Sequence, residues 1–148
     1  MGLAGKMGQF PSTSVQLQVP YYDVDIMEVV WNGNYFKYFE VARQAFFREC
    51  GLDLLGYQKE KKYVFPVIRS MIKHVRPLRL GDEFICTAFL REAKIKVVLG
   101  FEIKLVSNGL VCAKGQSEQV ALLVPEMEMV YKIPEDILKA LYGHKPLK

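Results

Sequence analysis

One long amphipathic helix is predicted over residues 34–50, and no other long helix is evident in the sequence. Its apolar residues recur at steps of three or four, which is the period of a helix that buries one face. They are Tyr35, Phe39, Ala42, Phe46 and Cys50. Gly51 stands where a glycine commonly ends a helix. The rest of the chain must therefore supply the surface that covers this face.

Most of the remaining chain alternates apolar and polar residues, as half-buried strands do. Strands are predicted at residues 14–22, 63–76, 83–91, 94–105 and 110–124. Pro20 suggests that the first of them is an edge strand, and Gly115 suggests a bulge or a close backbone approach in the last. The polar residues 51–62 are expected to be a solvated loop. Because strands and helices do not alternate, the predicted fold class is α+β, an antiparallel sheet wrapped around one long helix.

Length and composition indicate one soluble domain. The 148 residues fit a single domain, with residues 1–12 a flexible N-terminus or a remnant of cloning and residues 134–142 a short C-terminal helix opened by Pro134. No apolar run is long enough to cross a membrane. Three dispersed cysteines argue against disulfides and a zinc site and favour the cytoplasm. The net charge of +4 is too small to indicate nucleic-acid binding by itself.

The residues before the helix are the most suggestive chemically. Asp23 and Asp25 precede Asn32 and Asn34, which are both suitable helix caps. The N–H groups at a helix start have no acceptor inside the helix, and the helix dipole makes that end electropositive. A carboxylate beside such donors suits hydrolysis of an acyl compound. Local chemistry alone favours a second reading, in which both acids are turn residues.

Residues 25–35, with the sequence DIMEVVWNGNY, resemble the active-site motif of the hotdog-fold thioesterases, in particular the 4-hydroxybenzoyl-CoA thioesterase-like acyl-CoA thioesterases. The similarity continues through the helix and into residues 65–68, 76–82 and 133–135. It extends over nearly the whole chain, from about Val15 to Leu141. Because of this similarity, a catalytic role of Asp25 is favoured over the turn role that local chemistry alone favours.

The resemblance implies a hotdog fold and an enzyme that hydrolyses a small aliphatic or aromatic acyl-CoA without a metal or redox cofactor. Asp25 would act as nucleophile or general base, and the backbone N–H of Asn32 would polarise the thioester carbonyl. The active site would lie at the interface of a homodimer or homotetramer. The residues expected to contact the acyl group are Glu28, Trp31, Tyr35, Pro66 and Val67, and those expected to bind the coenzyme A phosphates are Arg91, Lys94 and Lys96.

The chain departs from the family pattern at Glu28, where a glycine is usual, and at Val29, where a histidine is usual. A glutamate changes both the backbone freedom and the charge at this position. It keeps open a second function, a non-hydrolytic hotdog protein that binds acyl thioesters as a sensor or carrier partner. A hotdog dehydratase is less favoured, because it needs a His paired with an acid and neither His74 nor His144 is expected near the helix start.

Overall fold

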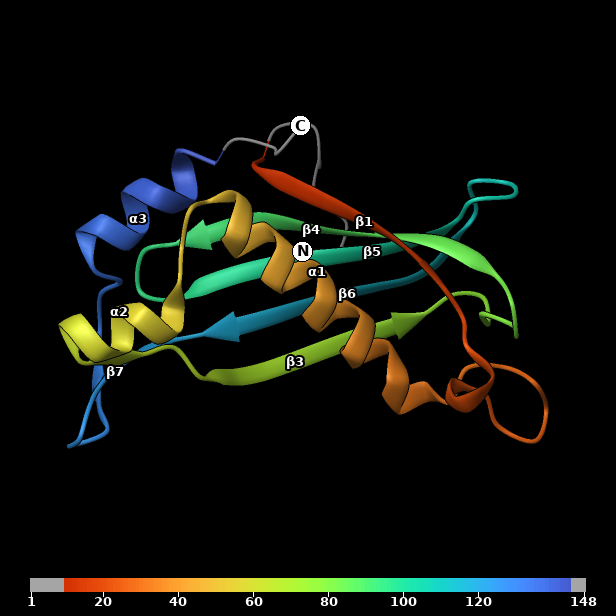
Figure 1. The fold of residues 1–148 in the computed structure, drawn as a ribbon, viewed down its shortest axis with the longest axis horizontal. Coiled ribbons are helices and arrows are strands. Elements are labelled where there is room, and N and C mark those ends of the chain that lie inside the picture. The colour runs from red at the N-terminus through yellow and green to blue at the C-terminus, as the bar shows by residue number, and fades with distance from the viewer. Residues whose placement is uncertain (1–9, 145–148) are drawn as a thin grey trace.

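The computed structural model describes residues 10–144 of the chain. Five antiparallel strands form the main sheet in the order β1-β4-β5-β6-β3, so β1 and β3 are its edges. Their bounds are β1 Ser12–Gln18, β3 Val67–His74, β4 Glu83–Ala93, β5 Val97–Leu105 and β6 Val111–Gln119. Helix α1, Tyr35–Glu49, lies across one face of this sheet (Figure 1). The predicted α+β arrangement is confirmed.

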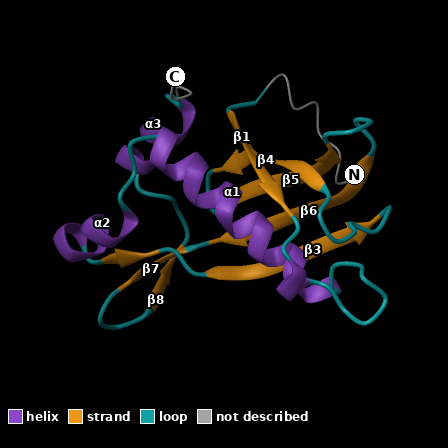
Figure 2. Ribbon diagram, turned by 45° about the vertical axis from the view of Figure 1, so that its right-hand side comes forward, coloured by secondary structure: helices purple, strands orange, loops and turns teal. Residues whose placement is uncertain are grey.

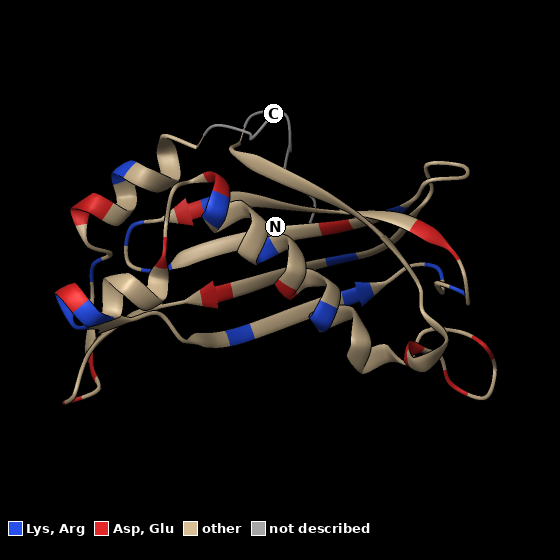
Figure 3. Ribbon diagram, in the orientation of Figure 1, with Lys and Arg blue, Asp and Glu red and all other residues tan. Residues whose placement is uncertain are grey.

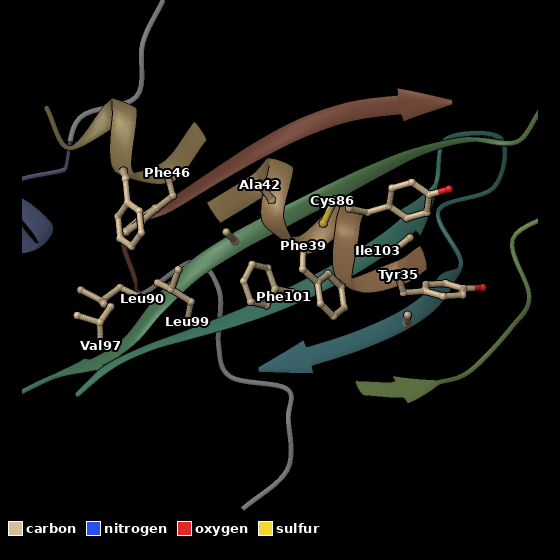
Figure 4. Close-up of a cluster of buried hydrophobic side chains, with 14 of the residues drawn as sticks. Tyr35, Phe39, Ala42, Phe46, Cys86, Leu90, Val97, Leu99, Phe101 and Ile103 are labelled. Atoms are coloured by element: carbon tan, nitrogen blue, oxygen red, sulfur yellow. The ribbon is translucent and has the colours of Figure 1, made fainter. Parts of the chain in front are cut away.

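The core lies between α1 and the sheet (Figure 4). The predicted apolar stripe of the helix is buried except for Cys50, which follows the last turn and is half-buried. At the centre, the ring of Phe39 stacks on Phe101, with centroids 4.6 Å apart, and covers Gly115. A Cβ at Gly115 would collide with the Phe39 ring. The close approach predicted at this glycine is confirmed.

A smaller sheet lies beside the main one, in the order β2-β7-β8 (Figure 2). It consists of β2 Tyr63–Val64, β7 Ala121–Leu123 and β8 Glu128–Val130. The long strand predicted over residues 110–124 is therefore wrong, because it divides at Val120 into β6 and β7. Pro66 interrupts the neighbouring chain at the same level, and its carbonyl accepts from Val120 N–H (3.2 Å). Proline cannot donate to a ladder, so strand pairing changes partner here.

Two short helices complete the fold, α2 Leu54–Lys61 and α3 Glu135–Tyr142. The solvated loop predicted over residues 51–62 is wrong in part, because most of it is helical. Asp53 caps α2 by accepting from Gly56 N–H (3.2 Å). The helix has no apolar face of its own, so periodicity did not reveal it. The predicted C-terminal helix is confirmed as α3.

The chain ends and the first strand differ slightly from expectation. Residues 1–9 of the expected flexible N-terminus lie outside the described residues, and Ser12 already belongs to β1. That strand ends at Gln18 rather than at residue 22, and a 3-10 turn, η2 Tyr21–Asp23, follows Pro20. Within residues 10–144, every helix is too short or too polar to span a bilayer.

Candidate active site

The loop between η2 and α1 presents the carboxylate of Asp25. Val24 and Val30 form a bridge that closes this loop, and Asp25 N–H donates to the carbonyl of Val29 (2.9 Å). Asp25 Oδ1 accepts from Met27 N–H (2.8 Å), which fixes the orientation of the carboxylate. Its other oxygen, Oδ2, has no hydrogen-bond partner among residues 10–144. The side chain is half-buried, so one oriented oxygen is available to a substrate.

Asp23 has a different, structural role. Its side chain is 3% exposed, and Oδ2 accepts from Tyr38 O–H (2.7 Å) while Oδ1 pairs with Lys37 Nζ. Its carbonyl accepts from Trp31 N–H (3.0 Å) and from the Asn34 side-chain amide (2.8 Å). Burial, and next the hydrogen bond to Asp23, raise the pKa of Tyr38. Asp23 thus holds both ends of the loop against α1. Of the two acids, only Asp25 remains accessible to a substrate.

A 3-10 turn, η3 Asn32–Asn34, leads directly into α1. Neither asparagine caps the helix through its side chain, contrary to expectation. The first N–H groups of a helix have no intrahelical acceptor, so those of Asn32 and Gly33 are candidate donors to a substrate at the electropositive end. The exposed Trp31 ring lies against Gly33, and a Cβ there would collide with it. A larger residue at position 33 would displace the exposed Trp31 ring from this place.

Glu28 adopts a left-handed backbone conformation, with φ of 62°. This is the position where the related family usually has glycine, and the conformation explains why glycine suits it. The Glu28 side chain is exposed, and its carbonyl accepts from Leu80 N–H (3.1 Å). Glu28 therefore adopts the left-handed conformation of this turn at the cost of backbone strain.

A cavity of about 230 Å³ opens beside the helix start. It is lined by Val30, Asn32, Tyr35, His74, Val75, Arg76 and Pro77. Tyr35 is buried, its hydroxyl accepts from Leu78 N–H (3.1 Å), and burial raises its pKa. Its ring meets His74 edge-on at 4.8 Å between centroids. The expectation that His74 lies far from the helix start is wrong, although no acid within the described residues hydrogen-bonds to it.

Val67 lies elsewhere, in the lining of a larger groove of about 620 Å³, and Pro66 stands between two lining residues, Phe65 and Val67. This groove runs between the C-terminal half of α1, the start of α2 and the start of β3. Its lining includes Glu40, Arg43, Gln44, Phe47, Arg48, Leu54, Leu55, Phe65, Val67 and Gln119. The groove lies along the later turns of α1 and the start of α2. The loop of residues 24–31 leads into the opposite, N-terminal end of α1, far from α2 (Figure 1). One chain therefore does not bring Asp25 together with Pro66 and Val67.

The three cations predicted to bind coenzyme A surround the hairpin between β4 and β5 (Figure 3). Arg91 donates to Gln116 Oε1 (3.2 Å), and Lys96 donates to Glu118 Oε1 (2.6 Å). Lys94 is exposed in the turn. Its carbonyl accepts from Ile133 N–H (2.8 Å), next to α3. The basic hairpin thus lies at the end of the molecule that holds the groove, away from Asp25.

No cluster of metal-ligating side chains occurs in residues 10–144. Cys50, Cys86 and Cys112 are free thiols, as predicted. Sequence reasoning did not identify Ser117 and Gln119, which lie on the inner face of β6 and reach the cavities beside α1. The two-residue period of β6 shows that Ser117 and Gln119 share a face of the strand. It does not distinguish them from the other residues on that face.

Comparisons with known proteins identify the family. The model of the thioesterase-like superfamily matches residues 19–141. The acyl-CoA thioesterase YbgC of Haemophilus influenzae is 26% identical over 131 residues, covering 88% of this chain and 94% of that protein. The putative acyl-CoA thioesterase YneP of Bacillus subtilis is 27% identical over 89 residues, covering 60% of this chain and only 64% of its own length.

Solved structures agree on the fold. The 4-hydroxybenzoyl-CoA thioesterase of Pseudomonas sp. strain CBS-3 superposes with a TM-score of 0.78 at 17% identity, covering 88% of this chain and 99% of that one. The hotdog fold and the class of enzyme predicted from the sequence, a thioester hydrolase, are confirmed. With its motif loop, its single long helix and residues 19–141 matched, the chain belongs to the thioesterase-like superfamily.

Proposed function

We propose that the protein hydrolyses acyl-CoA thioesters at a site formed by two copies of the chain. Asp25 and the Asn32 N–H would come from one copy. The groove beside α1, with Val67 in its lining and Pro66 next to it in the chain, would come from the other. The observation that carries this proposal is the separation of the Asp25 loop from the groove along α1, a helix about 22 Å long at 1.5 Å per residue. A two-fold axis that reverses the direction of α1 would bring the two together.

Edge strand β3 offers such an axis. Val67 and Ile68 at its start are 40% and 53% exposed, and its free edge can pair with another strand. Two β3 strands paired antiparallel about Met71, with the bulge between Val67 and Arg69, would set Val67 of one copy opposite His74 of the other. His74 and Asn32 line the same cavity. The groove of one copy would then continue into the helix-start cavity of its partner.

The chemistry follows from the two groups on the loop. The free Oδ2 of Asp25 would attack the thioester carbon while the Asn32 N–H stabilises the developing oxyanion. Breakage of the C–S bond would release the coenzyme A thiolate, which takes up a proton from solvent, and leave a mixed anhydride on Asp25. Water would then cleave the anhydride and restore the carboxylate. If Asp25 acts instead as general base, it would take the proton of the attacking water.

Other features support a proposed phosphate-binding region and a cytoplasmic location. The basic hairpin of Lys94 lies at the groove end, where it would face the phosphates of a coenzyme A bound across the two copies. The reaction requires neither a metal nor a redox cofactor. Free thiols in the core support the cytoplasm as its location.

The first experiment is a thiol-release assay over acyl-CoAs from short aliphatic to benzoyl. The Asp25→Asn variant should lower kcat by about 100-fold or more, because it removes the nucleophile or base. Asp136→Asn is the matched control, since Asp136 lies on α3 and its amide could still accept from Tyr57. Acyl-CoA binding without turnover in the parent protein would refute hydrolysis and favour the sensor function that Glu28 keeps open.

Mixed dimers test the shared site. A chain with Asp25→Asn would be combined with a chain whose groove is filled by Gln44→Trp, an exposed position on α1. Each variant alone should be nearly inactive. Random mixing should restore about a quarter of the parent activity, since half of the dimers would then hold one intact site of two. No recovery in proven mixed dimers would show that each site is built within a single chain.

A further inference from the structure

His74 brings a second group that can carry a proton to the cavity at the start of α1. It stands at the end of β3 and lines this cavity together with Asn32, whose N–H is the proposed oxyanion donor. Val30, in the same lining, forms with Val24 the bridge that closes the loop of Asp25. The cavity therefore connects His74 with the loop that carries the proposed nucleophile.

The ring of His74 is oriented by packing, whereas its nitrogens are available. It meets the buried Tyr35 ring edge-on, at 4.8 Å between centroids and 81° between ring planes. The backbone of His74 pairs with Ala113 of β6, which fixes its place in the sheet. The side chain is exposed, and neither ring nitrogen has a hydrogen-bond partner within residues 10–144. The nitrogens of His74 can thus contact a water molecule or a substrate.

The other polar groups of the cavity cannot accept a proton near neutral pH. The Tyr35 hydroxyl accepts from Leu78 N–H (3.1 Å), and burial raises its pKa, so it keeps its own proton. A guanidinium such as that of Arg76 does not lose its proton in proteins, and the side-chain amide of Asn32 does not titrate. Histidines gain and lose a proton between pH 5 and 8. Of the described residues that line this cavity, only His74 can act as a base.

The proposed reaction needs such a base in its second half. Attack by Asp25 on the thioester carbon forms a mixed anhydride and expels the coenzyme A thiolate. In this intermediate Asp25 has no free carboxylate, so it cannot take a proton from the attacking water. Another group must accept that proton while the water oxygen bonds to the acyl carbon. The electron pair of the broken C–O bond then returns to Asp25 as its carboxylate, and the acid is released.

We infer that His74 is the base that activates this water. The proton passes from the water to the imidazole, and the imidazolium then gives it to solvent. This inference rests on the proposed function and on its nucleophilic route through Asp25. In the proposed dimer, Val67 of one copy lies opposite His74 of the other, so His74 stands where the groove of one chain meets the cavity of its partner. A positioned base of this kind contributes about 100-fold or more to the rate.

Rapid-mixing measurement of thiol release separates the two halves of the reaction. The substrate is the acyl-CoA that the parent protein hydrolyses fastest. His74→Gln should lower kcat by about 100-fold and release about one thiol per site in an initial burst, because the anhydride still forms but is hydrolysed slowly. Hydroxylamine added after the burst should capture the acyl group as a hydroxamate.

Two more variants separate proton transfer from packing. His74→Phe keeps an aromatic ring against Tyr35 and should show the same burst, with a Tm close to that of the parent protein. His74→Ala leaves space for a free imidazole, and added imidazole should raise its kcat several-fold. The control is the parent protein, which imidazole should not accelerate.

The outcomes distinguish this inference from the proposed function. A kcat of His74→Gln within two-fold of the parent, with Asp25→Asn still impaired, would overturn the role of His74 and leave the proposed function intact. A lower kcat without a burst or hydroxamate would also overturn it, since His74 would then act before the anhydride forms. Absence of hydrolysis by the parent protein with every acyl-CoA would refute the proposed function and this inference together.

Discussion

Replacing Glu28 by glycine should stabilise the protein, although glycine is usually destabilising. Glu28 has φ of 62°, and an ordinary L residue in that conformation costs about 1–2 kcal/mol. Glycine gives back about 0.5–1 kcal/mol through its greater freedom in the unfolded chain. The Glu28 side chain is exposed and makes no hydrogen bond or ion pair with residues 10–144, so its loss costs little. The net stabilisation should be about 0.5–1 kcal/mol.

The assay is thermal unfolding at fixed protein concentration, with a Tm rise of about 1–4 °C expected for a chain of this size. Glu28→Ala is the matched control, because it removes the same side chain and keeps the left-handed strain. It should leave Tm nearly unchanged. The reasoning is refuted if Glu28→Gly is no more stable than Glu28→Ala, since relief of strain would then not be the cause.

Two further results are expected. Tyr38→Phe should lower the free energy of unfolding by about 1–3 kcal/mol in urea titration, because it removes one of the hydrogen bonds to the buried Asp23 carboxylate; an unchanged midpoint would mean that Lys37 alone suffices. Cys50 should react slowly with a thiol reagent at pH 8, because burial raises its pKa to about 12 and leaves little thiolate. Its rate should increase as the pH approaches that value, and reaction as fast as free cysteine at pH 8 would contradict the burial of this thiol.

Repeating patterns along the chain predicted the long helix and the approximate positions of the main strands, but not every strand end. The three-to-four residue period gave α1 within one residue at each end, because many apolar side chains face the same core. Two-residue alternation located the strands of the main sheet for the same reason. The short helix α2 was not predicted because it has no apolar face. Its one sequence signal of a helix start, the capping residue Asp53, is also common in loops.

The two acids of the motif show the limit of sequence reasoning most clearly. Asp23 and Asp25 are the same residue type, two positions apart, so the local sequence does not show which of them is buried. The packing of α1 decides it. Tyr38 and Lys37, from the first turns of the helix, reach Asp23 and leave Asp25 on the loop. Likewise, Glu28 stands out in the sequence as an unusual residue, and only the backbone angle shows that the turn there is left-handed, a conformation that favours glycine.

The sequence by itself determined the fold class and the family, because each depends on local periodicity or on a contiguous motif, and the same motif predicts Asp25 as the catalytic residue. Only the tertiary structure decided which residues share a site. Asp25 and the groove lined by Val67 are separated along α1. Three buried atoms without a hydrogen-bond partner in residues 10–144 come together from α1 and β6, namely Arg43 Nε, Ser117 Oγ and Gln119 Oε1. These relations arise from strand pairing and helix docking between segments distant in sequence, and no local pattern encodes them.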